Sequence, residues 1–267
     1  LDYSNDTAPA TVPNATGFYP AGNSYAAVGN QSYGYFAGGY DNPYGDFRST
    51  VRRLDYSNDT ATTSPKGPLI NKGSKMAGTG NASYGWINNN ANGGNSSTIC
   101  RIEYANDTAT ASPKGNLNSD ERLRAATGSA DYGYFTGGLS PVNTFVDRIN
   151  YANDNIGASP KGNLVYAVRS HMAFSARELG LPQTPIPVPS IVAPFQPPFP
   201  FPVENFDVPT TGYGYVAGGD YSSRIERIDY ANDTATASLR SNLPTRNEDG
   251  GGAGNQSYGY TMGGYDG

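Results

Sequence analysis

Two phrases recur along this chain, and their repetition constrains its fold more than any other feature of the sequence. The phrase "RIEYANDTATASPKGNL" begins at Arg101 and returns with few changes from Arg52, Arg148 and Arg227, and the chain opens on a clipped copy, "LDYSNDTAPAT". A second phrase, of the type "YGYFAGG", alternates with the first and begins at Tyr33, Tyr84, Tyr132, Tyr213 and Tyr258. Such internal similarity indicates repeated units that bury a continuous core by stacking on one another.

The spacing of the phrases predicts the architecture. The repeated arginines Arg53, Arg101, Arg148 and Arg227 give unit lengths of 48, 47 and 79 residues, and the longest unit carries an insertion. A period of about 45 to 50 residues with several short strands in each unit is typical of a β-propeller. We therefore expect an all-β fold in which residues 1–267 form one propeller domain of four-stranded antiparallel blades.

The residues of the third unit predict the strands of one blade. The small residues of "RLRAATGS", which ends at Ser129, indicate a first strand near a crowded axis, and "YGYFTGG" indicates a second strand that stops at a glycine pair, where positive φ is permitted. Phe145 to Tyr151 is the expected third strand, and "AND" is the expected turn because Asn and Asp tolerate left-handed conformations. The segment "TATAS" is the expected fourth strand, ended by the proline of "PKGNL".

Composition agrees with strands and turns rather than with helices or disorder. Charged residues are only 15% of the chain, whereas aromatic residues are 12% and include 21 tyrosines. A disordered chain has fewer aromatic residues and more charge, and a helical chain needs more of the strong helix formers. Short blocks of Tyr, Thr, Ser, Asn and Gly favour strands joined by turns.

The same inventory disfavours several classes of function. The net charge of −5 and the lack of a basic stripe argue against a nucleic-acid partner. A single cysteine, Cys100, excludes an intramolecular disulfide, and a single histidine, His171, excludes a multi-histidine metal site. No apolar run reaches membrane-spanning length. We expect no cofactor, no bound metal and no membrane span.

The aligned units resemble kelch-type repeats. The double glycine of that family matches Gly38-Gly39, Gly137-Gly138, Gly218-Gly219 and Gly263-Gly264, and its tyrosine matches Tyr56, Tyr104, Tyr151 and Tyr230. The tryptophan of the family is missing, and Ala111 stands near its place. The resemblance covers nearly the whole chain outside the insertion and implies kelch-like blades around a central axis. The repeat phrase is also similar to repeats in predicted fibre-type proteins of marine viruses and phages.

The two ends of the chain predict how the ring closes. The chain begins within a third strand, at Leu1-Asp2-Tyr3, and ends after a second strand, at "YGYTMGGYDG". The C-terminal half-unit therefore lacks the two strands that the N-terminus supplies. We expect five blades, with the N-terminal strands completing the last one, because closure removes exposed sheet edges. A truncated member of a larger array is the alternative.

Two sets of repeated side chains allow both a functional and a structural interpretation. Each repeat arginine except Arg148 precedes, by two residues, an acid on the same strand face, as in Arg101 and Glu103. These pairs are either a ring of charged ligand sites or, as we favour, ion pairs that tie neighbouring blades together. Paired tyrosines, such as Tyr132 and Tyr134, either stack on sugar rings or, as we favour, fill the core between sheets.

We expect recognition where the repetition is interrupted. The loops after the glycine pairs vary in length and sequence, and variable loops on a rigid scaffold are suited to binding. In the second unit a tryptophan replaces a tyrosine and three asparagines replace Ala-Gly-Gly, which fits a sugar site, although sequence drift explains the change equally well. Because Asn tolerates positive φ, we expect this turn to survive. The candidate ligand-binding residues are Tyr40, Tyr44, Trp86, Asn88, Asn89, Asn90, Tyr221 and Tyr265.

The sequence contains no evident catalytic constellation. His171 falls in the first strand of its unit, and Cys100 precedes a repeat arginine, where other units have Arg52, Asp147 or Glu226. We interpret both residues as structural. Most acids belong to the repeat itself, which leaves no isolated carboxylate pair of the kind that glycoside hydrolysis uses.

The insertion is the largest interruption of the repeat. Residues 177–209 hold ten of the 20 prolines, interleaved with Ile, Val and Phe, and this composition favours extended polyproline II structure. Because a plain linker would be polar, we expect an interaction arm whose apolar side chains pack on the propeller or dock on another subunit. Its candidate contact residues are Phe195, Phe199, Phe201 and Phe206.

Together these features favour a protein that is not an enzyme. We expect an extracellular or virion-surface propeller that uses its varied loops for adhesion, or for binding a glycan or cell-surface receptor, and its arm for assembly with other subunits. The alternatives are a purely structural subunit of a fibre or filament, and a propeller hydrolase that acts from the mouth of the channel.

Overall fold

The computed structural model describes residues 22–42, 44–58, 60–175, 212–254 and 258–265. Regular structure in these residues consists of short strands and 3₁₀ turns, and this part of the chain contains no α-helix. Four repeats each form a four-stranded antiparallel sheet whose strands pair in chain order. The expected all-β fold with four-stranded units is therefore confirmed.

The four-stranded sheets have closely similar bounds. The first repeat contains β2 (Ala26–Gly29), β3 (Tyr33–Ala37), β6 (Val51–Asp55) and β7 (Ser64–Lys66). The second contains β8 (Gly78–Gly80), β9 (Tyr84–Asn88), β10 (Ile99–Glu103) and β11 (Ser112–Pro113). The third contains β12 (Ala125–Gly128), β13 (Tyr132–Thr136), β14 (Val146–Asn150) and β15 (Ser159–Pro160). The fourth contains β16 (Met172–Ser175), β17 (Tyr213–Ala217), β18 (Arg224–Asp229) and β19 (Ser238–Asn242).

Two smaller sheets complete the described strands. The first two strands of a fifth repeat, β20 (Gly251–Gly254) and β21 (Gly259–Met262), pair with each other. A separate three-stranded sheet is formed by β1 (Gly22–Asn23), β4 (Tyr40–Asp41) and β5 (Asp46–Phe47). This small sheet belongs to the first repeat and becomes important for the candidate site below.

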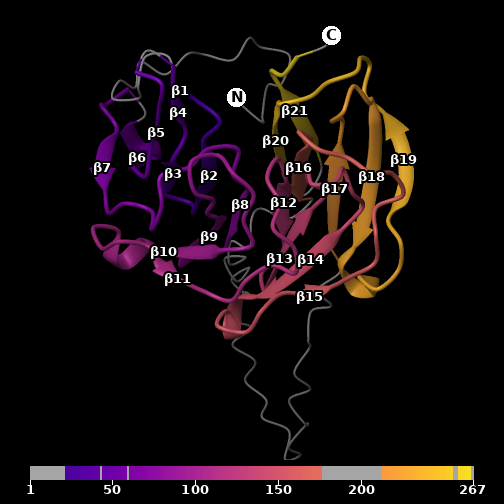
Figure 1. The fold of residues 1–267 in the computed structure, drawn as a ribbon, viewed down its shortest axis with the longest axis horizontal. Helices are drawn as coiled ribbons and strands as arrows, with labels where there is room; N and C mark the ends of the chain where they lie inside the picture. The colour runs from indigo at the N-terminus through magenta and orange to yellow at the C-terminus, as the bar shows by residue number, and fades with distance from the viewer. Residues whose placement is uncertain (1–21, 43, 59, 176–211, 255–257, 266–267) are drawn as a thin grey trace, which may run out of the picture.

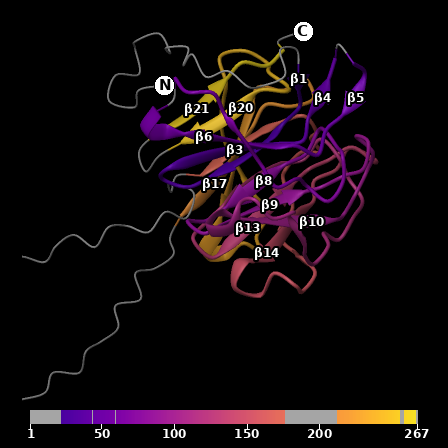
Figure 2. The same cartoon turned by 90° about the vertical axis from the view of Figure 1, so that its left-hand side faces the viewer.

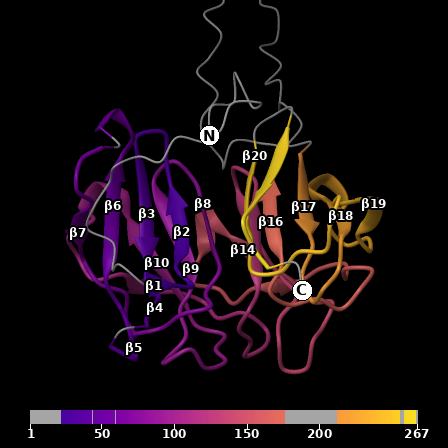
Figure 3. The ribbon, with the colours of Figure 1, turned by 90° about the horizontal axis from the view of Figure 1, so that it is seen from above.

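The sheets lie side by side around a common centre, in a propeller-like arrangement (Figure 1). The first strand of each repeat is innermost, and these strands contact one another in order, from β2 to β8, β12, β16 and β20. The fourth strands lie at the outside, as β7 and β19 do in Figure 3. Glycine and alanine dominate the innermost strands, as expected for segments that meet near an axis.

A residue two or three positions before each innermost strand adopts a left-handed backbone conformation. Backbone hydrogen bonds join these residues from one repeat to the next. Their φ values are 58° at Ser24, 57° at Lys75, 58° at Leu123, 50° at Ser170 and 57° at Asp249. Each N–H from Lys75 onward donates to the carbonyl oxygen of the equivalent residue in the preceding repeat, over 3.2, 3.2, 3.0 and 2.8 Å. All five repeats therefore hold equivalent positions about the centre.

The fourth strand differs from its predicted position. The letters "YSN" of the first repeat and "YAN" of the other three form 3₁₀ turns, namely η1 (Tyr56–Asn58), η2 (Tyr104–Asn106), η3 (Tyr151–Asn153) and η4 (Tyr230–Asn232). The fourth strand of the second repeat starts only at Ser112, and Pro113, its last residue, still pairs with Cys100. An outer edge strand tolerates a proline because its second edge needs no N–H donor.

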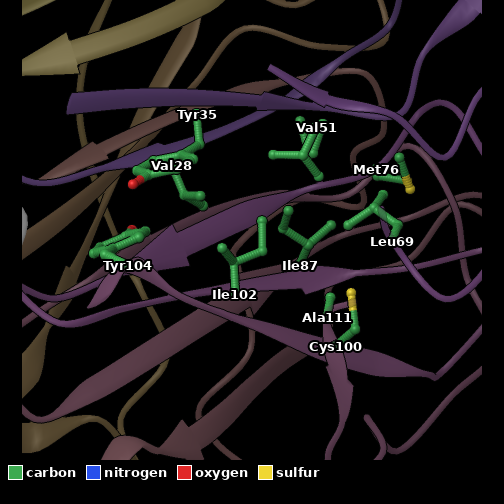
Figure 4. Close-up of a cluster of buried hydrophobic side chains, with 12 residues drawn as sticks. Val28, Tyr35, Val51, Leu69, Met76, Ile87, Cys100, Ile102, Tyr104 and Ala111 are labelled. Carbon is green, nitrogen blue, oxygen red and sulfur yellow. The ribbon is translucent and has the colours of Figure 1, made fainter. Parts of the chain in front are cut away.

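Apolar side chains between neighbouring repeats form the core. Figure 4 shows one such cluster, in which Val28 and Tyr35 of the first repeat face Ile87 and Ile102 of the second. Equivalent clusters join the second repeat to the third and the third to the fourth. The core is thus divided among the interfaces between repeats, as stacked units require.

The strand register gives each sheet two distinct ends. Ala26 pairs with Ala37, so the start of β2 lies beside the end of β3, and Tyr33 pairs with Asp55, so η1 lies at the opposite end. We call the first end the loop face, because it carries the loops that follow the glycine pairs. The second end is the turn face, and the connection from β16 to β17, which contains the insertion, belongs to it.

Candidate functional site

An aspartate in the turn of each of three repeats is held by three side chains of the preceding repeat. At Asp154, Arg101 Nη1 lies 2.8 Å from Oδ2, Lys114 Nζ lies 3.1 Å from Oδ1, and Trp86 Nε1 donates to Oδ2 over 2.9 Å. We call this arrangement the clasp. It recurs at Asp107 with Tyr35, Arg53 and Lys66, and at Asp233 with Tyr134, Arg148 and Lys161.

Aromatic rings reinforce each clasp. Trp86, which donates to the aspartate, also stacks on Tyr151 of the next repeat, with ring centroids 4.1 Å apart. The Tyr151 hydroxyl lies 2.8 Å from Thr79 Oγ1 on the innermost strand of the second repeat. The ring of Tyr84 lies 4.2 Å from the Arg101 guanidinium, a cation–π contact that keeps the arginine extended toward its aspartate. Both repeat phrases therefore supply parts of one interface.

Arg53, Arg101 and Arg148 tie neighbouring repeats together, as we favoured, but their partner is not the residue two positions later. Asp55 instead accepts the backbone N–H of Ser57 over 2.9 Å, and Asp229 accepts that of Ala231 over 3.0 Å. These acids stand where the strand passes into the 3₁₀ turn, so they cap that turn locally. The hydrogen bonds from the Ser57 side chain and backbone lower the pKa of Asp55.

The charge state of the clasp follows from its contacts. Burial disfavours the charged form of Asp107, but Lys66, Tyr35 and Arg53 outweigh this effect and lower the pKa of the aspartate. Burial, followed by the hydrogen bond to Asp107, raises the pKa of Tyr35. At neutral pH this clasp therefore joins the ionised Asp107 to the protonated Tyr35.

A glycine after the clasp lysine allows the next repeat to approach. Gly115 N–H donates to the Asp154 carbonyl oxygen over 2.8 Å. A Cβ at Gly115 would collide with the carbonyl oxygen of Ile156, which belongs to the next repeat. Gly67 and Gly162 meet the same restriction at the equivalent positions. The phrase "PKG" thus encodes a close backbone contact between repeats.

On the loop face, the first repeat carries a hairpin that projects from the body of the molecule (Figure 2). Asp41 pairs with Asp46 across the two strands, β4 and β5, and Tyr44 at the tip is 77% exposed. Arg48 Nη2 lies 2.7 Å from the buried carboxylate of Asp41, and Asp46 also pairs with Lys72 at 3.2 Å. This ion-pair network anchors the hairpin, so Tyr44 stands on a fixed support.

A cavity of about 700 Å³ lies among the five innermost strands, toward the loop face. All five repeats contribute the same short segment to its walls, namely residues 23–27, 75–78, 123–126, 170–173 and 249–252. Small side chains form most of the wall, and the left-handed residues Ser24, Lys75, Ser170 and Asp249 add polar groups. The loop face therefore combines a central hollow with protruding loops.

The four tyrosines predicted for ligand binding all lie beyond the glycine pairs on the loop face. Tyr44, Tyr221 and Tyr265 are 77%, 49% and 58% exposed. Tyr40 is partly buried and packs against Phe47, with ring centroids 5.0 Å apart. These residues come from the loops of the first, fourth and fifth repeats.

Four residues of the second repeat that were predicted to bind a ligand are structural instead. Trp86, Asn88, Asn89 and Asn90 are all completely buried. Trp86 is part of a clasp, where its ring stacks on Tyr151 and its N–H is used by Asp154. A surface role for these residues does not fit this burial, and the expectation is corrected accordingly.

The asparagines bind the connector that enters their own repeat, whereas the glycine pairs of other repeats contact the connector that enters the next one. In the first repeat, Gly39 N–H donates to the carbonyl oxygen of Gly73 over 2.8 Å. In the second repeat, the Asn89 side chain accepts from Asn71 N–H over 3.0 Å and donates to its carbonyl oxygen over 3.2 Å. The expectation of positive φ at these asparagines is wrong, since the left-handed positions of this loop are Asn92 and Gly93.

The single histidine and the single cysteine are both buried. His171 Nε2 lies 2.8 Å from Thr136 Oγ1, and burial, helped by the charge of Arg124, lowers the pKa of the histidine to about 3. Burial raises the pKa of the Cys100 thiol to about 12. Within the described ranges, no three His, Cys, Asp or Glu side chains gather in a way that could hold a metal ion.

Two buried acids act as structural anchors that the sequence patterns did not predict. Asp147 accepts the backbone N–H of Asn118 over 3.2 Å and its side-chain amide over 2.6 Å. Glu226 accepts the N–H groups of Val165 over 2.6 Å and Tyr166 over 3.2 Å. Each acid thereby fixes the connector that enters its own repeat. The available signal was an acid at an inward-facing strand position, where a charge needs dedicated partners.

The predicted arm and the predicted closing strands cannot be placed from the described residues. Residues 177–209, including Phe195, Phe199, Phe201 and Phe206, lie outside the described ranges, as do residues 1–21. The arm's attachment is described at its two flanks, where Ser175 pairs with Gly214 on the turn face.

No protein-family model matches this chain, and no curated protein matches its sequence. In the part of the chain that the structure covers, no helix has the length and hydropathy that a bilayer crossing requires. A functional assignment therefore depends on the chain's own residues.

Proposed function

We propose that the chain forms a five-bladed, kelch-like β-propeller whose N-terminal strands complete the fifth blade. The support is that four sheets and the pair β20–β21 surround one cavity to which five repeats contribute equivalent segments. The N-terminal "LDYSNDT" matches the third strand and turn of the other repeats. Asp6 stands in the N-terminal copy of the phrase where Asp107, Asp154 and Asp233 stand in theirs. We therefore assign Asp6 as the clasp aspartate of Arg227, which lies 4.0 Å from the Tyr213 ring.

Removal of residues 1–12 tests this closure. If these residues complete the fifth blade, their loss exposes one sheet edge and one clasp, and the midpoint of thermal unfolding falls by several degrees. The matched control is Asp2→Asn, because the acids equivalent to Asp2 lie outside the clasps. An equal midpoint for the shortened chain and the full chain would contradict closure by the N-terminus.

We propose that the protein is not an enzyme and that its loop face binds a glycan of a cell-surface receptor, as an adhesion module outside a cell or on a virion. The observation that carries this proposal is the exposed Tyr44 on an ion-paired hairpin, whereas Tyr35 and Tyr134 of the repeat are fully buried. A solvent-facing tyrosine on a fixed support stacks on a sugar ring and bonds its hydroxyls at low entropic cost. The proposed location rests on the resemblance of the repeat phrase to fibre-type proteins.

The engagement of the acids supports binding over hydrolysis. Asp107, Asp154 and Asp233 are held in clasps, and Asp147 and Glu226 accept hydrogen bonds from the connectors. A glycoside hydrolase needs two carboxylates that face one another across the substrate. Acids that already serve the scaffold are poorly suited to that task, so we favour recognition.

A glycan array followed by titration tests the binding proposal. The full chain is expected to bind at least one glycan class, and Tyr44→Ala is expected to weaken that binding about fivefold, since an aromatic contact is worth about 1 kcal/mol. Ile156→Ala is the matched control, because this residue is 64% exposed but follows η3 on the turn face. No binding to any glycan, or equal loss in both variants, would overturn the proposal.

We also propose that residues 177–209 act as an assembly arm that docks on another subunit. The support is compositional, since apolar side chains interleaved with proline need cover that a linker does not provide. Deletion of residues 179–208 is expected to lower the number of chains in the particle in solution. An unchanged number of chains and unchanged stability would exclude this role.

A further inference from the structure

A small polar cleft lies on the loop face of the fourth repeat. Its volume is about 90 Å³, and five of the side chains that line it carry polar groups, namely Tyr166, Asp220, Ser222, Arg224 and Glu226. The Arg224 guanidinium lies 3.7 Å from the centre of the Tyr166 ring, and this cation–π contact holds the ring in place. We call this site the Tyr166 cleft.

The wall of the cleft is ordered at its backbone as well as at its ring. One oxygen of the buried Glu226 carboxylate accepts the N–H of Val165 over 2.6 Å, and the other accepts the N–H of Tyr166 over 3.2 Å. Glu226 therefore serves the wall, and Tyr166 is fixed before any ligand arrives. A site that is ordered in advance avoids entropy that binding would otherwise cost.

The remaining polar groups of the cleft include an acceptor and two donors. Asp220 Oδ1 lies 3.2 Å from Arg169 Nε, whereas its Oδ2 meets no donor among the described residues. Ser222 Oγ accepts the backbone N–H of Arg224 over 3.1 Å, which leaves the hydroxyl proton to donate. Within the described ranges, no carboxylate pairs with the Arg224 guanidinium, which contacts the Tyr166 ring. Each of these groups can therefore bond a ligand.

The turn at the rim of the cleft holds a tyrosine in a strained conformation. Ser222 N–H donates to the Gly219 carbonyl oxygen over 2.8 Å, which closes a tight turn through Asp220 and Tyr221. These two residues have φ values of 47° and 58°. Turns of this kind favour Asn and Gly, and a bulky side chain with such a φ is strained. Because strain of this kind gathers at binding sites, the 49% exposed Tyr221 points to a role in recognition.

The fourth repeat departs from the others at the residues that build this cleft. Where it has Tyr166, the other connectors have Asn71, Ser119 and Thr245. Where it has Arg224, the other third strands have Thr50, Thr98 and Phe145. Because the other sheets form without this pair, the scaffold does not require it, and a local role for Tyr166 and Arg224 follows.

We propose that the Tyr166 cleft binds one uncharged sugar unit of a glycan, an inference that rests on the glycan binding proposed for the loop face. A sugar hydroxyl both donates and accepts, so it can bond the Asp220 carboxylate and the Arg224 guanidinium at once. An exposed tyrosine ring at the rim offers a face on which the sugar ring stacks. The small volume admits the edge of a single ring and leaves the rest of the glycan outside.

The charges around the cleft favour a neutral sugar over an acidic one. The lining acids Asp220 and Glu226 are matched by two arginines, Arg169 and Arg224, so the opposite charges balance. An acidic sugar would gain from Arg224 but would be repelled by the two carboxylates. The polar wall is also a poor match for the proline- and phenylalanine-rich insertion of the chain itself.

The test measures binding of single sugars to the full chain by saturation-transfer NMR and titration. The neutral probes are the methyl glycosides of glucose, galactose and mannose, and glucuronic acid is the acidic probe. At least one neutral probe is expected to bind more tightly than glucuronic acid. Tyr166→Ser and Arg224→Thr introduce residue types that other repeats carry at these positions, and each is expected to weaken binding about tenfold. Phe145→Thr is the matched control, because Phe145 is the exposed counterpart of Arg224 in the third repeat.

A further variant separates recognition by Tyr221 from a structural role. Tyr221→Asn removes the ring but keeps a residue that tolerates positive φ. It is expected to weaken sugar binding while the midpoint of thermal unfolding stays equal or rises. A lower midpoint with unchanged binding would show that this tyrosine serves the fold. Fluorescence of Trp86 verifies that each variant is folded.

The outcomes distinguish this inference from the function proposed for the loop face. Glycan binding that falls in Tyr44→Ala but is unchanged in Tyr166→Ser and Arg224→Thr would overturn the inference and leave the proposed function standing. Binding lost in both cleft variants and unchanged in Tyr44→Ala would support the cleft and refute the role of Tyr44. Preference for glucuronic acid would overturn the inference. Binding that occurs only after deletion of residues 179–208 would show that the insertion occupies the cleft, and this result would also overturn it.

Discussion

Arg101 and Asp154 are 53 residues apart in the chain, yet Nη1 of the arginine lies 2.8 Å from Oδ2 of the aspartate. They belong to neighbouring repeats, and the repeat phrase contains an equivalent of each. In the second and third repeats, the phrase therefore supplies a donor to the next repeat and an acceptor to the preceding one. Because one copy contributes to two interfaces, a substitution in it leaves a partner residue in a neighbouring repeat without its contact. This double use explains why the phrase recurs with so few changes.

Removal of the clasp acceptor is expected to destabilise the protein strongly. Asp154→Asn leaves Arg101 and Lys114 without their carboxylate, and breaking a buried ion pair costs about 3–5 kcal/mol. Because the Arg101 side chain is 22% exposed, solvent screening reduces the expected loss to about 2–3 kcal/mol. Urea unfolding at neutral pH measures it. The control is Glu103→Gln, an exposed acid outside the clasp, for which the expected change is below about 0.5 kcal/mol. Similar losses in both variants would refute the assignment.

The only tryptophan reports directly on a clasp. Trp86 is fully buried against Tyr151, so its emission in the folded protein is expected at short wavelength and is expected to resist quenching by acrylamide. Denaturation should shift the emission to long wavelength in the same transition that circular dichroism reports. Emission typical of an exposed indole in the native protein would show that Trp86 faces solvent, as a surface sugar site requires.

The glycine of "PKG" is expected to be essential for steric reasons. In Gly162→Ala, the added Cβ collides with the carbonyl oxygen of Ala235 in the next repeat, and overpacking of this kind costs about 1–3 kcal/mol. Gly157→Ala is the matched control, because its nearest heavy atom would be 3.5 Å away. Chemical denaturation of the two variants compares them. If Gly157→Ala is as destabilising as Gly162→Ala, the close approach between repeats does not explain why glycine recurs in "PKG".

The clasp predicts how stability depends on acid. The pKa of Asp107 is lowered from 3.8, so the unfolded chain binds its proton more readily than the folded protein does. The stabilising contribution of Asp107 is therefore present above about pH 4 and is lost as pH falls through the lower, folded pKa. Unfolding free energies of the wild type and Asp107→Asn are expected to converge between about pH 5 and pH 2. A constant difference over this range would contradict the charge assignment.

Sequence patterns within a single repeat were sufficient to predict its first two strands. The first and second strands of the third repeat, Ala125–Gly128 and Tyr132–Thr136, lie within their predicted segments, and Gly137 and Gly138 have the positive φ expected after them. The alternation of small and aromatic residues and the glycine pair are properties of a single strand and its turn, so the sequence contains them directly.

Contacts between repeats were harder to predict. Strand periodicity placed Arg101 and Glu103 on one face, but the true partner of the arginine lies in the next repeat, which a pattern within one strand does not identify. Trp86 was taken for a surface platform because its substitution for tyrosine is unusual, yet the indole N–H replaces the tyrosine hydroxyl as donor to the same aspartate.

A double-mutant cycle between Asp6 and Arg227 tests the central claim most directly, namely that one clasp, repeated between units, also closes the ring. Unfolding free energies are measured for the wild type, Asp6→Ala, Arg227→Ala and the double variant. Closure by the N-terminal strands predicts a coupling energy of about 1 kcal/mol or more between the two residues, as for contacting charged partners. Additive effects within about 0.3 kcal/mol would show that Asp6 does not occupy the clasp of Arg227 and would contradict the closed ring.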